Sequence, residues 1–274
     1  MLNPPWAVQQ KEHAPGLHDA FTIMTRRHFS PFKVFLSREH HTVVVLNPKV
    51  GSTTFRNITQ RAYREVLGRK NLSGGCYRLF KNAHKFPIAP LSDYAHAFSH
   101  PHDYKFYCFV RNPYARLKSA WQDKLAFGHV SGYPRSIRGK LVADIRRFAR
   151  QQDLPGQKED TAIPFSTFVN YIDSQEAGRR NHHWDEQYSV LLMDHISYTQ
   201  VFKMETQFNE GVKHVFGSIG IPENWIEGAL SERCNHCQQA AEGVFDEQLA
   251  SSAQRIFARD FSTFSYDVES WRRL

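Results

Sequence analysis

A run of residues in the first quarter of the chain has the composition of an anion-binding loop. Residues 43–46 are apolar and mostly β-branched, which is typical of a buried strand, and Asn47-Pro48 ends that strand. Lys49, Gly51 and three hydroxyl residues follow, at the start of a helix-compatible run. Backbone N–H groups at a helix N-terminus lack intrahelical partners, so such a loop can hold a phosphate. The alternative is an ordinary strand–turn–helix connection capped by a hydroxyl side chain. The expected phosphate ligands are Pro48, Lys49, Gly51, Ser52, Thr53 and Thr54.

A second candidate for anion binding follows another buried strand. Residues 105–110 are apolar and aromatic, and Arg111 comes directly after them. Asn112-Pro113 then predicts a helix start, with Asn as N-cap and Pro at the first helical position. Ser119 lies about two turns into that helix. A guanidinium suits phosphate, so Arg111 and Ser119 could bind one anion together; the alternative is a capping arginine and a surface serine.

The order of the remaining elements predicts an α/β fold. Strands that alternate with helices favour a central, mostly parallel sheet flanked by helices. We expect an irregular segment over residues 1–30, one domain over 31–274, and a helical insert or lid over about 128–188. Further strands are expected over 33–36, 94–99 and 198–203, and helices over 52–67, 112–127, 141–150, 166–172, 207–219 and 244–259.

Composition limits the class of protein and of partner. The 274 residues are 41% hydrophobic, enough to fill a core, and carry a formal charge of +8, which favours an anionic partner. No stretch approaches the ~18 apolar residues of a membrane span, and the first 18 residues lack the apolar core of a signal peptide. We therefore expect a cytoplasmic protein. Cys234 and Cys237 have CxxC spacing but no second ligand pair, which favours thiols or a local disulfide over zinc.

Taken together, the two phosphate-type motifs resemble a known family. Residues 48–53 resemble the 5′-phosphosulfate loop of PAPS-dependent sulfotransferases, and residues 111–119 resemble their 3′-phosphate motif. The likeness extends to Golgi carbohydrate sulfotransferases of the chondroitin and dermatan 4-O type and their bacterial relatives. It rests on V-R-N-P-Y-A-R-L-K-S-A-W at 110–121, H-W-D-E-Q at 183–187 with Glu186 in place of proline, F-K-M-E-T at 202–206, and D-F-S-T-F-S-Y at 260–266 with Ser265 in place of glycine.

This resemblance implies a fold and a reaction. The fold would be the P-loop NTPase-like sulfotransferase fold. The reaction would move the sulfuryl group from PAPS to a carbohydrate hydroxyl by in-line displacement, with PAP as product and no metal. Lys49 would neutralise charge on the departing phosphate oxygen. Loop residues 51–54 would hold the 5′-phosphate, and Arg111 with Ser119 the 3′-phosphate. The expected partner is a glycan or glycoconjugate acceptor.

A general base must accept the acceptor's proton, and histidine suits that role near neutral pH. His183 is the first candidate because it lies in a family-like element beside Trp184. Trp184 could stack on a sugar ring, or the pair could simply pack in the core. His96 and His100, just before the strand that ends at Arg111, are the alternative bases.

Two other functions compete with this interpretation. A P-loop kinase or NTPase shares the fold superclass, but the pattern G-x-x-x-x-G-K-[ST] is absent and Lys49 precedes Gly51 instead of following a glycine. A nucleic-acid-binding protein would fit the positive charge and the interspersed aromatic residues. The chain shows no recognisable nucleic-acid-binding motif, so we expect no nucleic-acid partner.

Overall fold

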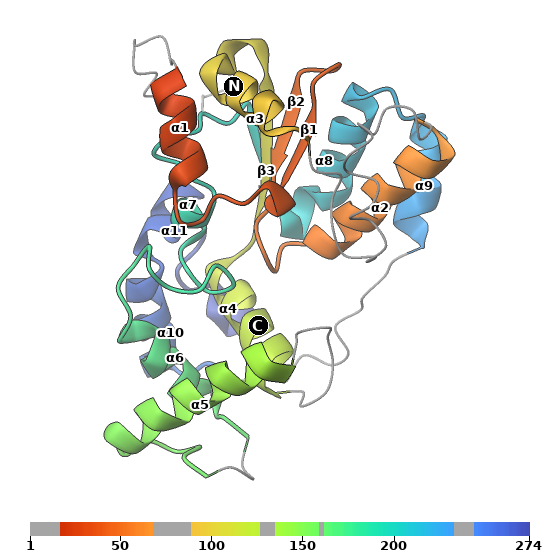
Figure 1. The fold of residues 1–274 in the computed structure, drawn as a ribbon. Helices are drawn as coiled ribbons and strands as arrows, with labels where there is room; N and C mark the ends of the chain where they lie inside the picture. Colours follow the sequence, from red (N-terminus) through yellow and green to blue (C-terminus); the bar gives the residue numbers. More distant parts are fainter. Residues whose placement is uncertain (1–16, 68–88, 127–134, 159–161, 233–243) are drawn as a thin grey trace. The chain divides into compact units, whose positions relative to one another are not determined.

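The computed structural model describes residues 17–67, 89–126, 135–158, 162–232 and 244–274 (Figure 1). These fall into two compact units, described separately below. The first comprises Met1–Arg111 and Gln187–Gln238, and the second Asn112–Glu186 and Gln239–Leu274.

The first unit contains a four-stranded sheet that is mostly parallel. Its strand order is β1-β2-β3-β4, with β1 and β2 antiparallel and the other two pairs parallel, which confirms the predicted central, mostly parallel sheet. The register pairs Val45 with Cys108 and Val110 with Lys203, so β2, β3 and β4 end at one edge. The strands are β1 (Val34–Ser37), β2 (Thr42–Val45), β3 (Lys105–Val110) and β4 (Gln200–Lys203).

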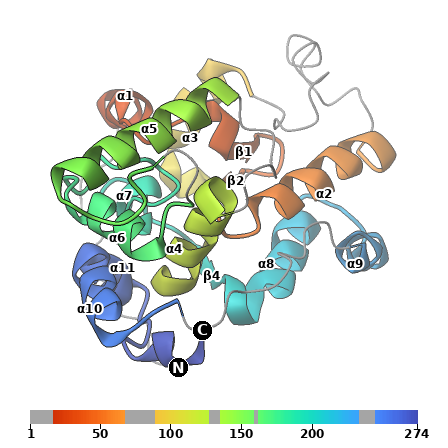
Figure 2. The ribbon, with the colours of Figure 1, turned by 90° about the horizontal axis from the view of Figure 1, so that it is seen from below.

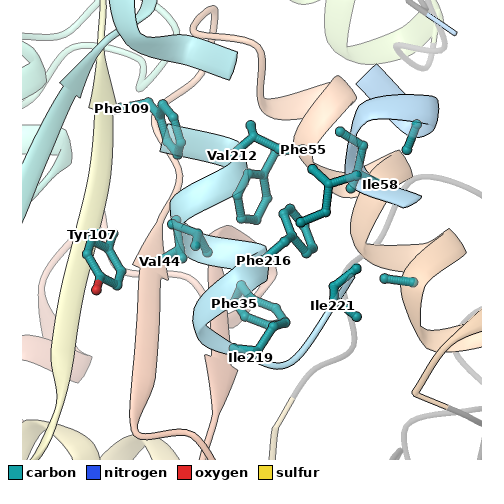
Figure 3. Packing of buried hydrophobic residues seen from close by; sticks show 14 of the residues in the cluster. Phe35, Val44, Phe55, Ile58, Tyr107, Phe109, Val212, Phe216, Ile219 and Ile221 are labelled. Atoms are coloured by element: carbon teal, nitrogen blue, oxygen red, sulfur yellow. The ribbon is translucent and has the colours of Figure 1, made fainter. Parts of the chain in front are cut away.

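Helices cover both faces of this sheet because the strands are apolar on both sides. Tyr107 and Phe109 of β3 join a buried cluster with Phe55 of α2 and Phe216 of α8 (Figure 3). On the other face, Phe98 of α3 stacks on Phe106 at a 6.0 Å centroid distance, and α1 packs beside α3. The helices are α1 (Leu17–Thr25), α2 (Ser52–Glu65), α3 (Leu91–Ser99), α7 (Gln187–Val190), α8 (Met204–Ser218) and α9 (Glu223–Ser231); single 3₁₀ turns span Pro31–Lys33 and Pro101–Asp103.

The described part of the second unit is helical. Its core is rich in aromatic residues: Phe165 and Phe245 meet edge to face at 4.9 Å, and Phe148 of α5 meets Tyr171 of α6 at 5.6 Å. Figure 2 shows α6 beside α10, in agreement with their contacts. The elements are α4 (Pro113–Trp121), a π-helical turn (Gln122–Ala126), α5 (Arg135–Gln151), α6 (Phe165–Asp173), α10 (Glu247–Ile256), α11 (Ala258–Thr263) and a final 3₁₀ turn (Ser270–Arg273).

Several local predictions were wrong. Residues 94–99, predicted as a strand, lie in α3, where Tyr94, Ala97 and Phe98 are buried at helical spacing. The helix predicted over 244–259 is two helices, because the backbone leaves helical geometry at Phe257 (φ −116°, ψ 28°). The helix predicted over 166–172 begins one residue earlier, at Phe165, after the N-cap residue Pro164.

The N-terminal segment expected to be irregular contains α1, and residues 1–16 lie outside the described residues. Cys234 and Cys237 also lie outside them. The insert predicted over 128–188 contains α5 and α6, while its role and the single-domain boundary at 31–274 stay predictions. Among the described helices, none is long and apolar enough to cross a bilayer.

Candidate active site

The loop between β2 and α2 folds through two residues with left-handed backbone geometry. Lys49 has φ +70° and Gly51 has φ +78°. A Cβ atom on Gly51 would lie 2.5 Å from Cε2 of Phe208, so only glycine fits there. Lys49 carries a Cβ and pays about 1–2 kcal/mol for its conformation, so its neighbours must hold it in place.

The N-terminus of α2 presents its backbone donors without a side-chain cap. The N-cap residue is Gly51, and the first intrahelical bond joins Phe55 N to Gly51 O at 3.0 Å. The three preceding N–H groups therefore have no acceptor within the helix. The hydroxyls of Ser52, Thr53 and Thr54 share this helix end, and Thr53 is exposed. Pro48 is buried at the start of the loop.

Arg111 comes together with Lys49 at this edge of the sheet. Its Nη1 donates a hydrogen bond to the backbone oxygen of Lys49 at 3.1 Å, and both side chains are half-buried. Arg111 is the first residue after β3, and Lys49 lies four residues beyond β2. Two cations that the sequence placed on separate strands thus lie beside one helix N-terminus.

A buried amide that sequence reasoning missed joins the two strand ends. Gln187 Oε1 accepts from Arg111 N at 2.9 Å, and Gln187 Nε2 donates to Arg111 O at 2.8 Å. The same Oε1 accepts from Asn47 Nδ2 at 2.7 Å. Asn47 and Gln187 are both fully buried. The sequence did contain a signal for this residue: Gln187 is the last residue of the H-W-D-E-Q element, but the sequence alone assigned it no role.

Asn112 begins the second unit and caps α4 as predicted. Its Oδ1 accepts from Tyr114 N at 3.0 Å and Ala115 N at 3.3 Å, and its Nδ2 donates to Ser270 Oγ at 2.7 Å. Ser119 lies further along α4 and is 8% exposed. Because Arg111 and Ser119 belong to different units, their shared anion stays a prediction.

The segment that carries His183 is held by a buried arginine whose role the sequence did not reveal. Arg116 of α4 donates from Nη1 to Asp185 O at 2.7 Å and from Nη2 to His182 O at 3.0 Å. His183 N donates to Asn181 Oδ1 at 3.0 Å, and the His183 side chain is half-buried. The turn therefore fixes the backbone on both sides of His183.

Trp184 belongs to the core, which decides between the two uses considered for it. The side chain is 2% exposed, meets Phe168 edge to face at 5.4 Å, and donates from Nε1 to Gln175 Oε1 at 3.3 Å. A buried indole cannot stack on a sugar. Glu186, which replaces the family's proline, is also buried; burial first, and the nearby Asp260 second, raise the pKa of its carboxyl.

His96 and His100 lie at the opposite edge of the sheet from Lys49. Their rings stack at 4.5 Å, and His96 Nδ1 lies 3.2 Å from the hydroxyl of Tyr104, the residue before β3. Arg111 follows the other end of that six-residue strand, roughly 20 Å away at 3.3 Å per residue. Both histidines therefore lie near the start of β3 and not near the end that leads to Arg111.

The charges at the carboxyl edge suit one kind of ligand. A lysine, an arginine and a helix N-terminus together favour an anion with several oxygens, such as a phosphate. Within the part of the chain that the structure describes, no group of three or more His, Cys, Asp or Glu residues could hold a metal. The arrangement can bind a phosphate and stabilise charge that develops on it.

Comparisons with known proteins agree with this chemistry. The chain is 22% identical over 252 residues to carbohydrate sulfotransferase 14 of Danio rerio, covering 86% of this chain and 62% of that protein. It is 24% identical to carbohydrate sulfotransferase 11 of Rattus norvegicus, covering 62% and 49%, and 23% identical to carbohydrate sulfotransferase 9 of Homo sapiens, covering 70% and 42%. The chain thus spans roughly half the length of these curated relatives. No solved structure matches it significantly.

These relatives correct one expectation. We expected a cytoplasmic protein, but carbohydrate sulfotransferases of the type to which the motifs were compared are Golgi membrane enzymes. The cytoplasmic assignment conflicts with that likeness and is withdrawn.

The family comparison covers nearly the whole described chain. The model of the sulfotransferase family matches residues 33–267, from the residue before β1 to beyond α11. This range includes the Lys49 loop, Arg111 and the His183 segment. The chain therefore belongs to the sulfotransferase family.

Proposed function

We propose that this protein transfers the sulfuryl group of PAPS to a hydroxyl of a carbohydrate. One observation carries the proposal: the hydrogen bond that joins Arg111 to Lys49 beside the uncapped start of α2. Family membership supports sulfotransfer as the reaction, and the names of the relatives support a carbohydrate acceptor.

The residues of the loop fit the two phosphates of the donor. The free amides of residues 52–54, with their hydroxyls, suit the 5′-phosphate, and the glycine at position 51 lets the backbone approach it. Arg111 provides a planar donor set for the 3′-phosphate, which distinguishes PAPS from ATP. We assign Ser119, two turns into α4, to the same phosphate.

The transfer step makes demands that Lys49 and His183 can meet. A bond forms between the acceptor oxygen and sulfur while the bond from sulfur to the bridging phosphate oxygen breaks. Negative charge then develops on that phosphate oxygen, where the ammonium of Lys49 would stabilise it. The acceptor hydroxyl loses a proton, which we assign to His183 as general base.

We also propose that the fold is P-loop NTPase-like. A parallel strand, a glycine-containing loop and a helix N-terminus follow one another at β2, residues 46–51 and α2. The parallel pairing of β2 with β3 supports this arrangement. The lysine of the loop comes before the glycine, as in the sulfotransferase loop that it resembles, and not after it, as in the pattern G-x-x-x-x-G-K-[ST] of nucleotide kinases.

Transfer of radiolabel from PAPS to glycans, with product identification, tests the activity. In parallel, titration calorimetry should show PAP binding without magnesium. Magnesium-dependent ATP hydrolysis in place of transfer would overturn the proposal.

A further inference from the structure

The amide of Gln187 occupies the place of a strand partner just beyond the end of β3. It accepts from the N–H of Arg111 and donates to the C=O of the same residue, at 2.9 and 2.8 Å. A neighbouring strand would supply one donor and one acceptor in the same way. Because both bonds are present, the amide orientation is fixed, with Oε1 toward the N–H and Nε2 toward the C=O.

The same amide also reaches the end of β2. Gln187 Oε1 accepts a second hydrogen bond from Asn47 Nδ2 at 2.7 Å. The backbone hydrogen bonding between β2 and β3 ends at the pair Val45 and Cys108, so the two strands separate where the loop begins. Gln187 and Asn47 carry the connection onward through their side chains, in a fully buried setting where hydrogen bonds are strong and unpaired groups costly.

This connection leads directly to Lys49. Arg111, whose backbone Gln187 holds, donates through its guanidinium to the Lys49 carbonyl. Lys49 adopts φ +70°, which a non-glycine residue keeps only when its surroundings impose it. Asn47 lies two residues before Lys49 in the same loop. Gln187 thus acts on both ends of the segment that orients the lysine.

We propose that Gln187 is a positioning residue for the transfer reaction: its side-chain amide locks the ends of β2 and β3 together, so that Arg111 and Lys49 are held in a fixed relation at the donor site. This inference rests on the proposed function. In this role Gln187 makes no contact with the donor itself. It sets the distance between Arg111 and Lys49, which bind the donor.

The substitution Gln187→Glu tests the proposal through pH. An ionised glutamate keeps the acceptor toward Arg111 N but places a second acceptor against Arg111 O. A protonated glutamate restores the donor, and burial favours that form. Relative to wild type at each pH, we expect PAP affinity and kcat to fall about tenfold at pH 8 and to return within about threefold at pH 5.5. Thermal melting at both pH values confirms that the variant is folded.

Gln207→Glu is the matched control. Gln207 Oε1 accepts from Lys203 N at 3.1 Å at the end of β4, and a glutamate oxygen keeps that contact. The PAP affinity and kcat of this variant, each relative to wild type, should therefore not change with pH. If Gln187→Glu does not fold at pH 8, Asn47→Ala replaces it. That variant removes only the Asn47 bond and should weaken PAP binding severalfold at every pH.

Hydrogen exchange at the Arg111 amide separates this inference from the proposed function. The ionised glutamate keeps the acceptor for Arg111 N, but its repulsion from Arg111 O should open this contact more often. Exchange should therefore be faster in Gln187→Glu than in wild type at pH 8, whether or not the protein transfers sulfate. A wild-type protein that neither binds PAP nor transfers sulfate refutes the function. A folded Gln187→Glu variant with wild-type exchange, PAP affinity and kcat at pH 8 refutes the positioning role alone.

Discussion

Arg111 covers the backbone oxygen of Lys49, with Nη1 3.1 Å from that oxygen. A carbonyl in an anion-binding loop would repel an incoming phosphate, and the guanidinium neutralises that oxygen by a charge-assisted hydrogen bond. The same contact fixes the peptide of a residue with φ +70°. One arginine therefore removes a repulsive dipole from the loop and orients the lysine.

Lys49→Ala should abolish transfer while leaving donor binding largely intact. The ammonium matters most when charge develops on the departing oxygen, so its loss should lower kcat by roughly 10²–10³-fold. PAP affinity should fall much less. Steady-state kinetics and calorimetric PAP titration measure the two effects. Lys213→Ala is the control and should behave as wild type. Lys213 lies on α8, where it forms ion pairs with Glu223 and Glu227 of α9.

Arg111→Ala should instead weaken donor binding. It removes the fork assigned to the 3′-phosphate and the hydrogen bond to Lys49 O. We expect PAP affinity to fall at least tenfold, since hydrogen bonds to charged groups are worth roughly 1.5–3 kcal/mol. Arg111→Lys keeps the charge but loses the planar geometry, so it should recover only part of the affinity. Equal affinity in all three proteins would contradict the assignment.

Local sequence signals were enough to predict the two strand ends of the site. The apolar run before Asn47, the cap at Asn112 and the glycine at position 51 each determine their own neighbourhood. They were readable because strand, cap and left-handed turn depend on adjacent residues. The pairing of Gln187 with Asn47 spans 140 positions and follows from no local pattern. At Arg111, Gln187 binds the backbone and not the side chain. Any residue type could supply that partner, so the sequence gives no sign of the contact.

The errors in the fold have a similar cause. The segment 94–99 is short, and its aromatic and small residues fit a strand pattern as well as a helix. Its helical state depends on packing between α1 and the sheet, which a single segment does not encode. Likewise, the role of Arg116 depends on two backbone oxygens 66 and 69 positions away.

Gly51→Ala should destabilise the protein. The alanine would carry φ +78° and place its Cβ 2.5 Å from the ring of Phe208, so both backbone strain and overpacking oppose it. The cost should be roughly 2–5 kcal/mol in the free energy of unfolding. Urea denaturation measures it. Gly217→Ala is the matched control: it lies in α8 with no atom within 4 Å of the new Cβ, and should gain about 0.5–1 kcal/mol.

Glu186→Gln should stabilise the protein in a pH-dependent way. Because burial and then Asp260 raise the pKa of the Glu186 carboxyl, the folded state holds a proton that the unfolded chain has already lost. Stability therefore falls as the pH rises between the unfolded and the folded pKa. The neutral amide avoids this loss, so Tm should exceed that of wild type at pH 8, and the difference should shrink toward pH 4. Glu176→Gln, at an exposed carboxylate, should show no such trend.

His183→Ala should distinguish the three histidines proposed as the base. If His183 accepts the proton, kcat should fall roughly 10²–10⁴-fold with little change in PAP affinity, because the imidazole acts on the acceptor and not on the donor. His96→Ala and His100→Ala should keep full activity, since His96 contacts Tyr104 and His100 stacks on His96, both near the start of β3. Full activity in His183→Ala together with loss in His96→Ala would reverse the assignment. Measuring kcat and PAP affinity for all three variants at one pH decides between these outcomes.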